Sequence, residues 1–293
     1  MKRSRGRQQA HPGADPGCRS CNGFGFVVVP EGEVARTAPC ECAKPCPLCG
    51  GTGFVARSEA FRAPRARCLC QVFAARAAAL DAVGIPARHA GSTRASFVPQ
   101  DKLQTAVLGQ VSQFVSAFTA SHGDTRGLVL YGDVGRGKTH LLVALLRELV
   151  VDHGVRARFV EFSHLLSDLK AGFDRGQGTA ALIDPLVEVD VLGIDELGKG
   201  RATDFEATVI DEIVSRRYNA MRPVLATTNF APGEPTARPT GNAAGAQLGL
   251  ERPPTLADRV GDRVYSRLRE TCDFVPVRGD DYRQRRRTRR GRV

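Results

Sequence analysis

The stretch that most constrains the fold is residues 127–142, GLVLYGDVGRGKTHLL. It begins with a short apolar run, continues through a glycine-rich turn and ends in a segment with helical spacing. In the pattern GxxxxGK[ST], the Lys138 ammonium can reach the β- and γ-phosphates of a nucleotide, and the Thr139 hydroxyl can hold Mg²⁺. The start of the following helix also attracts negative charge. The stretch therefore predicts a phosphate-binding loop.

The predicted ATP contacts extend over the whole loop. Its glycines have no Cβ, so successive backbone N–H groups can turn toward one polyphosphate. By chance, this pattern would occur in a chain of this length with a probability of about one per cent. We therefore expect real nucleotide binding, through Gly132, Asp133, Val134, Gly135, Arg136, Gly137, Lys138, Thr139 and His140.

The segments around the loop alternate between strand and helix patterns. Apolar runs predict strands at 128–131, 157–161 and 189–194, and helical spacing predicts helices at 138–151 and near 163–172. Such alternation is typical of a parallel sheet with helices on its faces. We therefore predict an α/β fold built on a doubly wound parallel sheet.

Polar side chains follow two of the apolar runs. In VDVLGIDELG, Asp195 and Glu196 come directly after a strand, and in PVLATTNF, Asn229 does the same. An apolar strand that ends in Asp-Glu is common and can simply start a helix. Together with Lys138, however, the pair indicates an ATPase site, with Asp195 and Thr139 holding Mg²⁺ and Glu196 polarising the attacking water. We predict that Asn229 senses the γ-phosphate, because ligands bind at the carboxyl ends of such strands.

Cysteines define a second feature, a tandem repeat between residues 18 and 70. Each copy contains CxxC, then a probable hairpin, then CxC, which we place on a strand because side chains two residues apart leave the same face of a strand. Four thiolates per copy are what a closed tetrahedral zinc site needs. The predicted zinc ligands are Cys18, Cys21, Cys40, Cys42, Cys46, Cys49, Cys68 and Cys70.

A disulfide framework is the alternative for these cysteines, and reduced thiols in a cytosolic protein favour metal. The CxxCxGxG segments resemble the zinc knuckles of DnaJ-type chaperones. We expect two structural zinc ions that supply roughly 10 to 16 kcal/mol of folding free energy each. The pairing stays open, because Cys18 and Cys21 could join Cys40 and Cys42 or be nested with Cys68 and Cys70. Cys272 stands apart and reads as a core residue.

Charge is unevenly distributed along the chain. Lys and Arg number 42 against 31 Asp and Glu, a net charge of +11, and arginines crowd residues 283–292. Such a tail is either a solubilising end or a salt-sensitive contact to nucleic-acid phosphates. No apolar run reaches the roughly 18 residues of a membrane helix, and the start has no secretory pattern. We therefore expect a cytoplasmic protein with no membrane partner.

Six motifs in order carry a family resemblance: GIPARH, GDVGRGKTHLL, VLGIDELG, VLATTNF, GDRVYSRLRE and DYR. Together they resemble the AAA+ ATPases of the DnaC/DnaI helicase-loader group, with the IstB transposition ATPases as relatives, over about residues 83–283. The resemblance implies a P-loop NTPase of the AAA+/ASCE class with a reduced lid, and an ATPase that is slow alone and stimulated by partners. It also implies an ATP-dependent homo-oligomer that engages a replicative helicase and single-stranded DNA.

The same resemblance assigns roles to three arginines. Arg267, with Arg263 as the near alternative, corresponds to the finger that reaches a neighbouring subunit's nucleotide, and Arg283 corresponds to a second sensor. Taken without the resemblance, the helix pattern at 257–272 would leave its arginines solvated. An IstB-like transposition helper and a zinc-dependent binding adaptor with a slow nucleotide switch are the alternative functions.

The expected organisation follows from these motifs. Helical patterns at 71–83 and 102–121 flank the boundary between the cysteine repeat and the ATPase segment. The predicted parts are a basic disordered start at 1–17, the Cys₄ module at 18–70, a helical connector at 71–98, the ATPase domain at 99–283 with a flexible insertion at 231–255, and a basic tail at 284–293.

Overall fold

The computed structural model describes residues 10–57, 64–200, 203–233 and 253–282. The chain divides into two compact units. The first unit comprises residues 1–91 and 147–157, and the second comprises residues 92–146 and 158–293. The predicted tail at 284–293, Arg283 and most of the predicted insertion at 231–255 lie outside the described residues. The domain boundaries drawn from the motifs stay a prediction.

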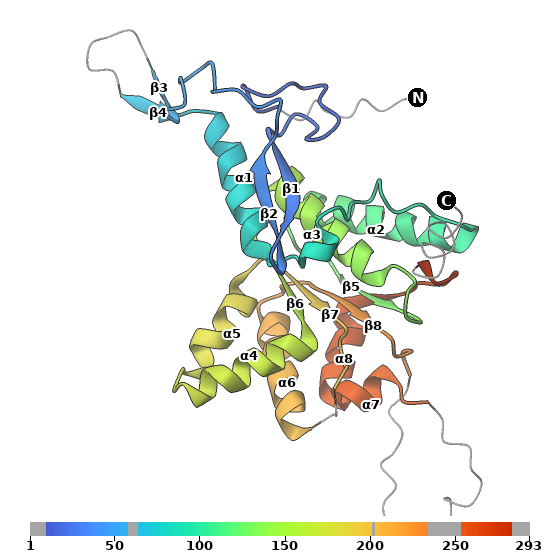
Figure 1. The fold of residues 1–293 in the computed structure, drawn as a ribbon. Helices are drawn as coiled ribbons and strands as arrows, with labels where there is room; N and C mark the ends of the chain where they lie inside the picture. The colour runs from blue at the N-terminus through green and yellow to red at the C-terminus, as the bar shows by residue number, and fades with distance from the viewer. Residues whose placement is uncertain (1–9, 58–63, 201–202, 234–252, 283–293) are drawn as a thin grey trace, which may run out of the picture. The chain divides into compact units, whose positions relative to one another are not determined.

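A five-stranded parallel sheet forms the centre of the second unit, in the order β6-β7-β8-β5-β9 (Figure 1). Strands β5, β7 and β8 are almost entirely buried, as expected for central parallel strands covered on both faces. The predicted doubly wound α/β fold is therefore confirmed. The strands are β5 (Gly127–Tyr131), β6 (Ala157–Glu161), β7 (Val191–Asp195), β8 (Val224–Thr228) and β9 (Cys272–Pro276).

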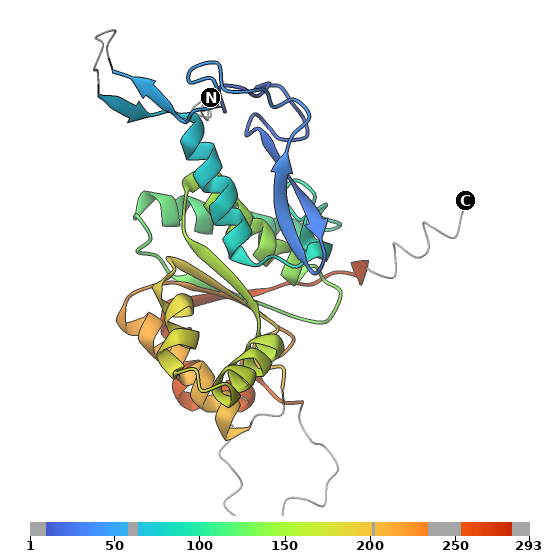
Figure 2. The same cartoon turned by 60° about the vertical axis from the view of Figure 1, so that its left-hand side comes forward.

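Helices cover both faces of this sheet. Figures 1 and 2 show α2 and the start of α3 on one face, and α4, α5, α6 and α8 on the other. Apolar side chains from the second group, such as Leu169, Ile213 and Leu268, form one buried core with the strands. The helices are α2 (Lys102–Ala120), α3 (Lys138–His153), α4 (Phe162–Asp174), α5 (Thr179–Glu188), α6 (Asp204–Asn219), α7 (Leu256–Val260) and α8 (Asp262–Thr271).

Local signals fix several of these helix boundaries. The Asp101 carboxylate accepts a 2.7 Å hydrogen bond from the Gln104 N–H, which caps α2. The segment 257–272, which we expected to be one helix, forms two. Gly261 has a φ of 84°, a value outside the helical range, so the chain turns there between α7 and α8.

Two antiparallel hairpins, one per cysteine copy, lie in the first unit. They are β1 (Phe26–Glu31) with β2 (Val34–Pro39), and β3 (Phe54–Ala56) with β4 (Arg65–Arg67). Helix α1 (Cys70–Val83) follows, and then a short 3₁₀ helix, Ala87–His89. The first hairpin is tied to α1, because the Asp81 carboxylate accepts hydrogen bonds from the N–H and hydroxyl of Thr37, at 2.6 and 2.8 Å.

Two expectations for the first unit are wrong. The CxC segments are not on strands, since β2 ends at Pro39 and Cys70 is the first residue of α1. A turn after each hairpin, rather than strand alternation, brings the two sulfurs together. Residues 10–17 are not disordered either, because the His11 N–H donates to the Gly23 carbonyl at 2.8 Å and its ring contacts Phe73 at 5.5 Å.

No helix within the described ranges has both the length and the apolar character needed to cross a bilayer.

Arg217 on α6 is the bulkiest fully buried side chain that the structure describes. Burial lowers the pKa of its guanidinium to about 10, so the group still carries its charge at neutral pH. Its N–H groups donate to five carbonyls, at 2.8 to 3.2 Å. These belong to Leu186, Val187, Val189, Asp190 and Pro223. One arginine thus supplies hydrogen-bond donors to the backbone carbonyls at the end of α5, in the turn that follows it and just before β8.

We expect Arg217→Met to lower the free energy of unfolding by about 3 kcal/mol or more, because several buried carbonyls lose their donors. Arg216→Met is the matched control. Arg216 is half-exposed and pairs with Asp184 at 2.7 Å, so its loss should cost less than about 1 kcal/mol. Urea unfolding of both variants measures the difference, and equal destabilisation would contradict the role given to Arg217.

Candidate nucleotide site and cysteine clusters

The loop between β5 and α3 adopts a conformation that requires glycine. Gly132 and Gly137 have φ values of 139° and 89°, which side-chain-bearing residues rarely adopt. A Cβ at Gly132 would lie 2.5 Å from the Val277 carbonyl oxygen, and one at Gly137 would lie 2.9 Å from the Phe97 ring. The loop backbone is therefore packed between Val277, which follows β9, and Phe97 in the segment before α2.

The Lys138 ammonium joins the two sides of the site. Its Nζ donates three hydrogen bonds of 2.7 Å, to the carbonyls of Gly132 and Asp133 and to Oδ1 of Asn229. The side chain is buried. The structure thus brings together two residues that the sequence assigned to the γ-phosphate, one from the start of α3 and one from the end of β8.

A second contact links the start of α3 to the end of β7. The Thr139 hydroxyl donates to the Asp195 carboxylate at 3.0 and 3.1 Å, and the Thr227 hydroxyl donates to Asp195 Oδ1 at 2.5 Å. Burial raises the pKa of Asp195, so a cation beside this carboxylate would offset the cost of keeping it ionised. Sequence reasoning missed Thr227. The available signal was its position two residues before Asn229 on a buried strand.

Glu196 has an unusual backbone and an unexpected partner. Its φ is 56°, and its N–H donates to the Thr227 hydroxyl at 3.0 Å. Its carboxylate accepts a hydrogen bond from Lys199, whose Nζ also lies 3.8 Å from Glu161 Oε1. The hydrogen bond to Glu196 raises the pKa of Lys199. Glu196, the predicted base, is therefore ion-paired with Lys199, and sequence reasoning selected neither Lys199 nor Glu161.

His140, a predicted ATP contact, is hydrogen-bonded to the segment before α2. Its Nε2–H donates to the Thr93 carbonyl at 2.9 Å, and its ring lies 5.8 Å from the ring of Phe97. Burial lowers the pKa of this histidine, which favours the neutral ring. His140 thus anchors the segment before α2 to the start of α3.

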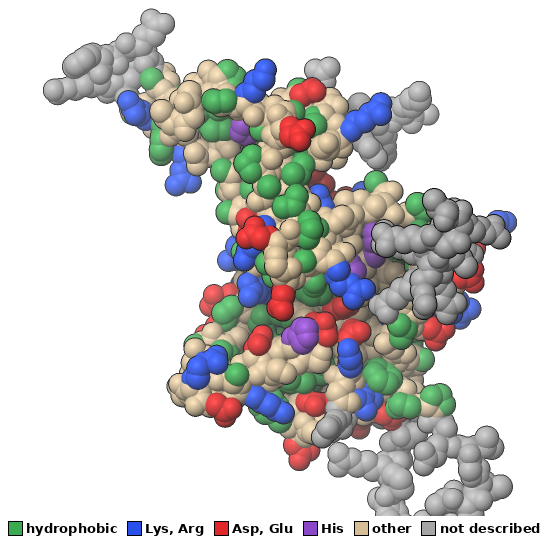
Figure 3. Space-filling model, in the orientation of Figure 1, with side chains coloured by type: hydrophobic (Ala, Val, Ile, Leu, Met, Phe, Trp, Pro, Cys, Tyr) green, Lys and Arg blue, Asp and Glu red, His purple; other side chains and the backbone are tan. Residues whose placement is uncertain are grey.

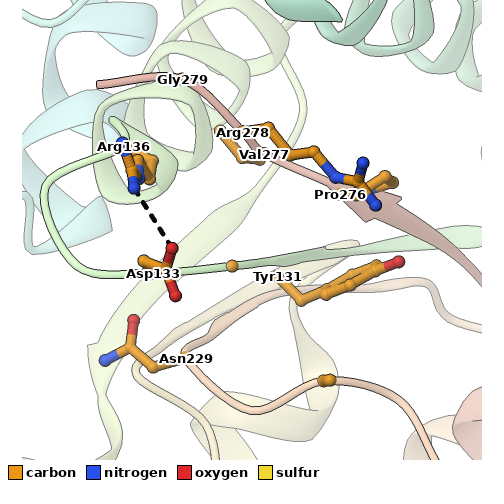
Figure 4. A pocket seen from close by; sticks show the side chains of 10 residues that line it. Tyr131, Asp133, Arg136, Asn229, Pro276, Val277, Arg278 and Gly279 are labelled. Carbon is orange, nitrogen blue, oxygen red and sulfur yellow. Dashed lines mark hydrogen bonds and ion pairs between the residues drawn. The ribbon is translucent and has the colours of Figure 1, made fainter. Parts of the chain in front are cut away.

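A pocket of about 420 Å³ opens at the carboxyl ends of β5, β8 and β9 (Figure 4). On the loop side, Arg136 pairs with Asp133 at 3.2 Å, while the exposed Val134 lies outside the pocket. Asn229, which follows β8, lies near Asp133 in this view. The lining residues are Tyr131, Gly132, Asp133, Arg136, Asn229, Ala231, Pro276, Val277, Arg278 and Gly279.

The two candidate finger arginines share one partner away from the loop. Arg267 pairs with Asp211 at 2.8 Å and Arg263 at 3.6 Å, with side chains 28% and 76% exposed. The structure of a single chain does not bring either to Lys138. Arg283 lies outside the described residues, and its neighbour Tyr282 donates its N–H to the Gly135 carbonyl at 3.0 Å.

The cysteines form two separate clusters, one per copy, and in each the sulfurs lie within 4.8 Å of one another. The nested pairing is therefore not the one adopted. Close sulfur pairs in each copy are 3.5 to 3.7 Å apart, too far for a disulfide. Zinc–sulfur bonds of about 2.3 Å place tetrahedral sulfurs at nearly this spacing. The clusters are Cys18, Cys21, Cys40 and Cys42, and Cys46, Cys49, Cys68 and Cys70.

Protonation differs within one cluster. Although burial opposes it, the Gly53 N–H and the neighbouring Cys70 thiol lower the pKa of Cys49 to about 6. Burial and the other sulfurs raise the pKa of Cys70 to about 12. Without a cation, such a cluster does not hold four thiolates at neutral pH, so the donor set fits a zinc ion. Cys272 is buried separately in the core of the second unit.

The chain is similar to proteins of DNA replication. The replicative helicase loader DnaC of Escherichia coli (strain K12) is 30% identical over 148 residues, which are 50% of this chain and 58% of that protein. The uncharacterized protein YqaM of Bacillus subtilis (strain 168) is 28% identical over 158 residues, which are 52% of this chain and 43% of that protein. The chain thus spans about half the length of the curated relatives it matches.

Solved structures give the same picture. The crystal structure of the DnaC helicase loader matches with a TM-score of 0.53 and 28% identity, covering 65% of this chain and 99% of that one. AMPPCP-bound DnaA from Aquifex aeolicus, at 18% identity and a TM-score of 0.50, shares the fold over 68% of this chain and 54% of its own. The resemblance to AAA+ ATPases of the DnaC group is therefore confirmed.

A family model described as IstB-like ATP binding protein matches residues 110–290, more than half of the chain. The matched range contains the phosphate loop, both strand-end carboxylates and the paired arginines. The chain belongs to the IstB-like ATP-binding protein family.

Proposed function

We propose that this protein is an ATP-hydrolysing helicase loader of the DnaC type, which assembles with copies of itself when ATP is bound. The observation that carries the proposal is the convergence of Lys138 with Asn229 and of Thr139 with Asp195 at one edge of the sheet. The four side chains come from the start of α3 and from the carboxyl ends of β7 and β8, in the order of the family motifs. The similarity to DnaC supports the same use of the site.

The residues divide the work of ATP hydrolysis. Lys138 exchanges its three present oxygen partners for oxygens of the β- and γ-phosphates. The N–H groups of the loop donate to the same phosphate oxygens. Thr139 and Asp195 would hold Mg²⁺, which would supply positive charge to neutralise the phosphates. Glu196 orients and polarises the attacking water. For that step its carboxylate must leave Lys199, so hydrolysis requires a rearrangement at the end of β7.

In the assembled form, a neighbouring copy supplies a further positive charge to the nucleotide. We infer that Arg267, with Arg263 as the alternative, reaches the nucleotide of a neighbouring copy after it leaves Asp211. Their shared pairing with Asp211 supports a resting state in which neither is committed to a neighbour. Partner contact, with a replicative helicase and single-stranded DNA, then sets the rate. Arg283 as second sensor and a cytoplasmic location remain predictions.

The cysteine clusters have a structural role in this proposal. Each would hold one Zn²⁺ through four sulfurs, which leaves no open position for catalysis. The second cluster includes the first residue of α1, so the ion would fix the start of that helix.

An IstB-like transposition helper is the second candidate, favoured by the family model that matches the chain. It would use the same ATP site to organise DNA for a transposase. A pull-down from native lysate with the Glu196→Gln chain and ATP separates the two, since it captures a hexameric helicase in one case and a transposase in the other.

We expect Lys138→Ala to abolish ATP binding and Glu196→Gln to retain it while turnover falls by about 10²- to 10⁴-fold. A fluorescent ATP analogue measures binding, and phosphate release measures turnover. Val134→Ala is the control within the loop, because the Val134 side chain is exposed and lies outside the pocket, so its loss should change affinity only modestly. Equal loss of binding in both main variants would contradict the role given to Glu196.

Arg267→Ala should leave ATP affinity nearly unchanged and remove partner-stimulated hydrolysis, since a finger supplied in trans is worth about 10³- to 10⁵-fold in rate. Arg263→Ala tests the alternative in the same assay. The experiment measures ATPase rate against protein concentration, with and without single-stranded DNA. Undiminished stimulation in both variants would exclude a finger from α8.

Zinc removal should unfold the first unit and leave the second folded. The purified chain should contain two zinc ions, and each should contribute roughly 10 to 16 kcal/mol to folding of its module. Protons compete for the thiolates, so zinc should be released as the pH falls and retained as it rises. Metal analysis and circular dichroism during chelation measure both effects, and a metal-free chain with an intact first unit would rule the sites out.

A further inference from the structure

The two cysteine copies share their ligands but differ in the outer face of the hairpin. In the second copy, Phe54 lies opposite Arg67 and Ala56 lies opposite Arg65. Paired residues and residues two apart lie on the same face of a hairpin, so these four side chains form one surface. All four are exposed, and Phe54 is 48% exposed. We call this surface the Phe54 face.

The other side of the same hairpin packs against the rest of the module. Val55 packs against the second cysteine cluster, and Ala66, its partner across the hairpin, is half-buried. The Phe54 face is therefore directed away from the cluster that holds the module together. Packing of the module gives no reason for a phenylalanine there.

The corresponding face of the first copy has a partner within the chain. Its positions are Phe26 opposite Pro39 and Val28 opposite Thr37, and none of them is basic. Thr37 is hydrogen-bonded to Asp81 of α1, and the half-buried Phe26 contacts Phe24, whose ring lies 6.0 Å from Phe73 of the same helix. One copy is thus docked on α1, while the equivalent face of the other is exposed.

The two copies also differ in their content of charged residues. Residues 18–45 contain three basic and three acidic residues, whereas residues 46–73 contain four arginines and one glutamate. Within the described part of the chain, the guanidinium groups of Arg65 and Arg67 form no ion pair. Any negative charge on the metal-bound sulfurs is the same in both copies, so it does not cancel this difference. Figure 3 shows basic side chains next to hydrophobic ones at the end of the unit that carries β3 and β4.

We propose that the Phe54 face binds single-stranded nucleic acid. An exposed aromatic ring offers a surface for one unstacked base, and flanking arginines neutralise the phosphates on either side of it. In a duplex the bases are already stacked, so a single strand is the form that this surface fits. One ring gives no means of reading sequence. The surface rests on the zinc-bound fold proposed above, but not on the ATP site.

The test uses the full-length, zinc-loaded chain without nucleotide, and measures anisotropy of labelled oligo(dT) and oligo(rU) of about 30 nucleotides, several times the site size of one small module. Phe54→Ser should weaken binding by about 5- to 100-fold with an unchanged salt dependence. Arg65→Gln with Arg67→Gln should weaken it and reduce the slope of log K against log salt by about 1.4, the value for two phosphates on a single strand.

Arg19→Gln with Lys44→Gln is the matched control, because it removes two exposed charges from the first copy. It should change affinity less than about 2-fold, since these charges lie off the Phe54 face. Zinc content is measured for every variant, so loss of the fold is distinguished from loss of the surface. ATP binding is measured in parallel and should be the same in every variant as in the unaltered chain. Failure of the ATP-site proposal is thereby distinguished from failure of this one.

Wild-type affinity in both Phe54-face variants, with zinc intact, would overturn the proposal. So would equal binding of duplex and single strand, because a stacking surface discriminates between them. In the pull-down from native lysate, the same variants could lose a protein that the unaltered chain captures. If they do so while still binding the oligonucleotides, the proposal is overturned and the face is assigned to a protein partner. Equal loss with oligo(dT) and oligo(rU) supports a site for either nucleic acid, and loss with only one identifies which.

Discussion

The hydrogen bonds of one buried ammonium group organise the second unit around its site. Lys138 bonds two loop carbonyls and the side chain of Asn229, and so it joins the end of β5 to the end of β8. A positive charge in such a place is stable only while oxygens surround it. The loop carbonyls and the amide of Asn229 supply them here, and phosphate oxygens are the natural replacement. The position of the Lys138 ammonium is thus suited to a phosphate ligand.

Much of this architecture could be predicted from the sequence, because its signals are local. The glycine pattern, the apolar runs and the strand-end Asp195 and Asn229 depend on neighbours within a few residues. Thr227 and the pair Lys199 and Glu161 escaped prediction because their roles depend on which strands lie side by side. The turn at Gly261 was missed for another reason, since a single glycine within a helical pattern does not reveal its φ.

The two copies of the cysteine repeat have the same ligands but different contacts with the rest of the first unit. Both copies keep the same four sulfurs at the same spacing, so both could hold a metal ion. Only the first has Thr37 bonded to Asp81 of α1. The second copy lacks that contact and has arginines, Arg65 and Arg67, at the equivalent surface positions. The ligand pattern could be read from the sequence, whereas the docking of only one copy required the structure.

A crystal structure of the zinc-loaded chain with Mg²⁺ and a non-hydrolysable ATP analogue tests the central claim most directly. The account predicts that Lys138 leaves Asn229 and the loop carbonyls for the β- and γ-phosphate oxygens, and that Thr139 and Asp195 lie around the metal ion. A triphosphate bound elsewhere, with the three bonds of Lys138 unchanged, would contradict it.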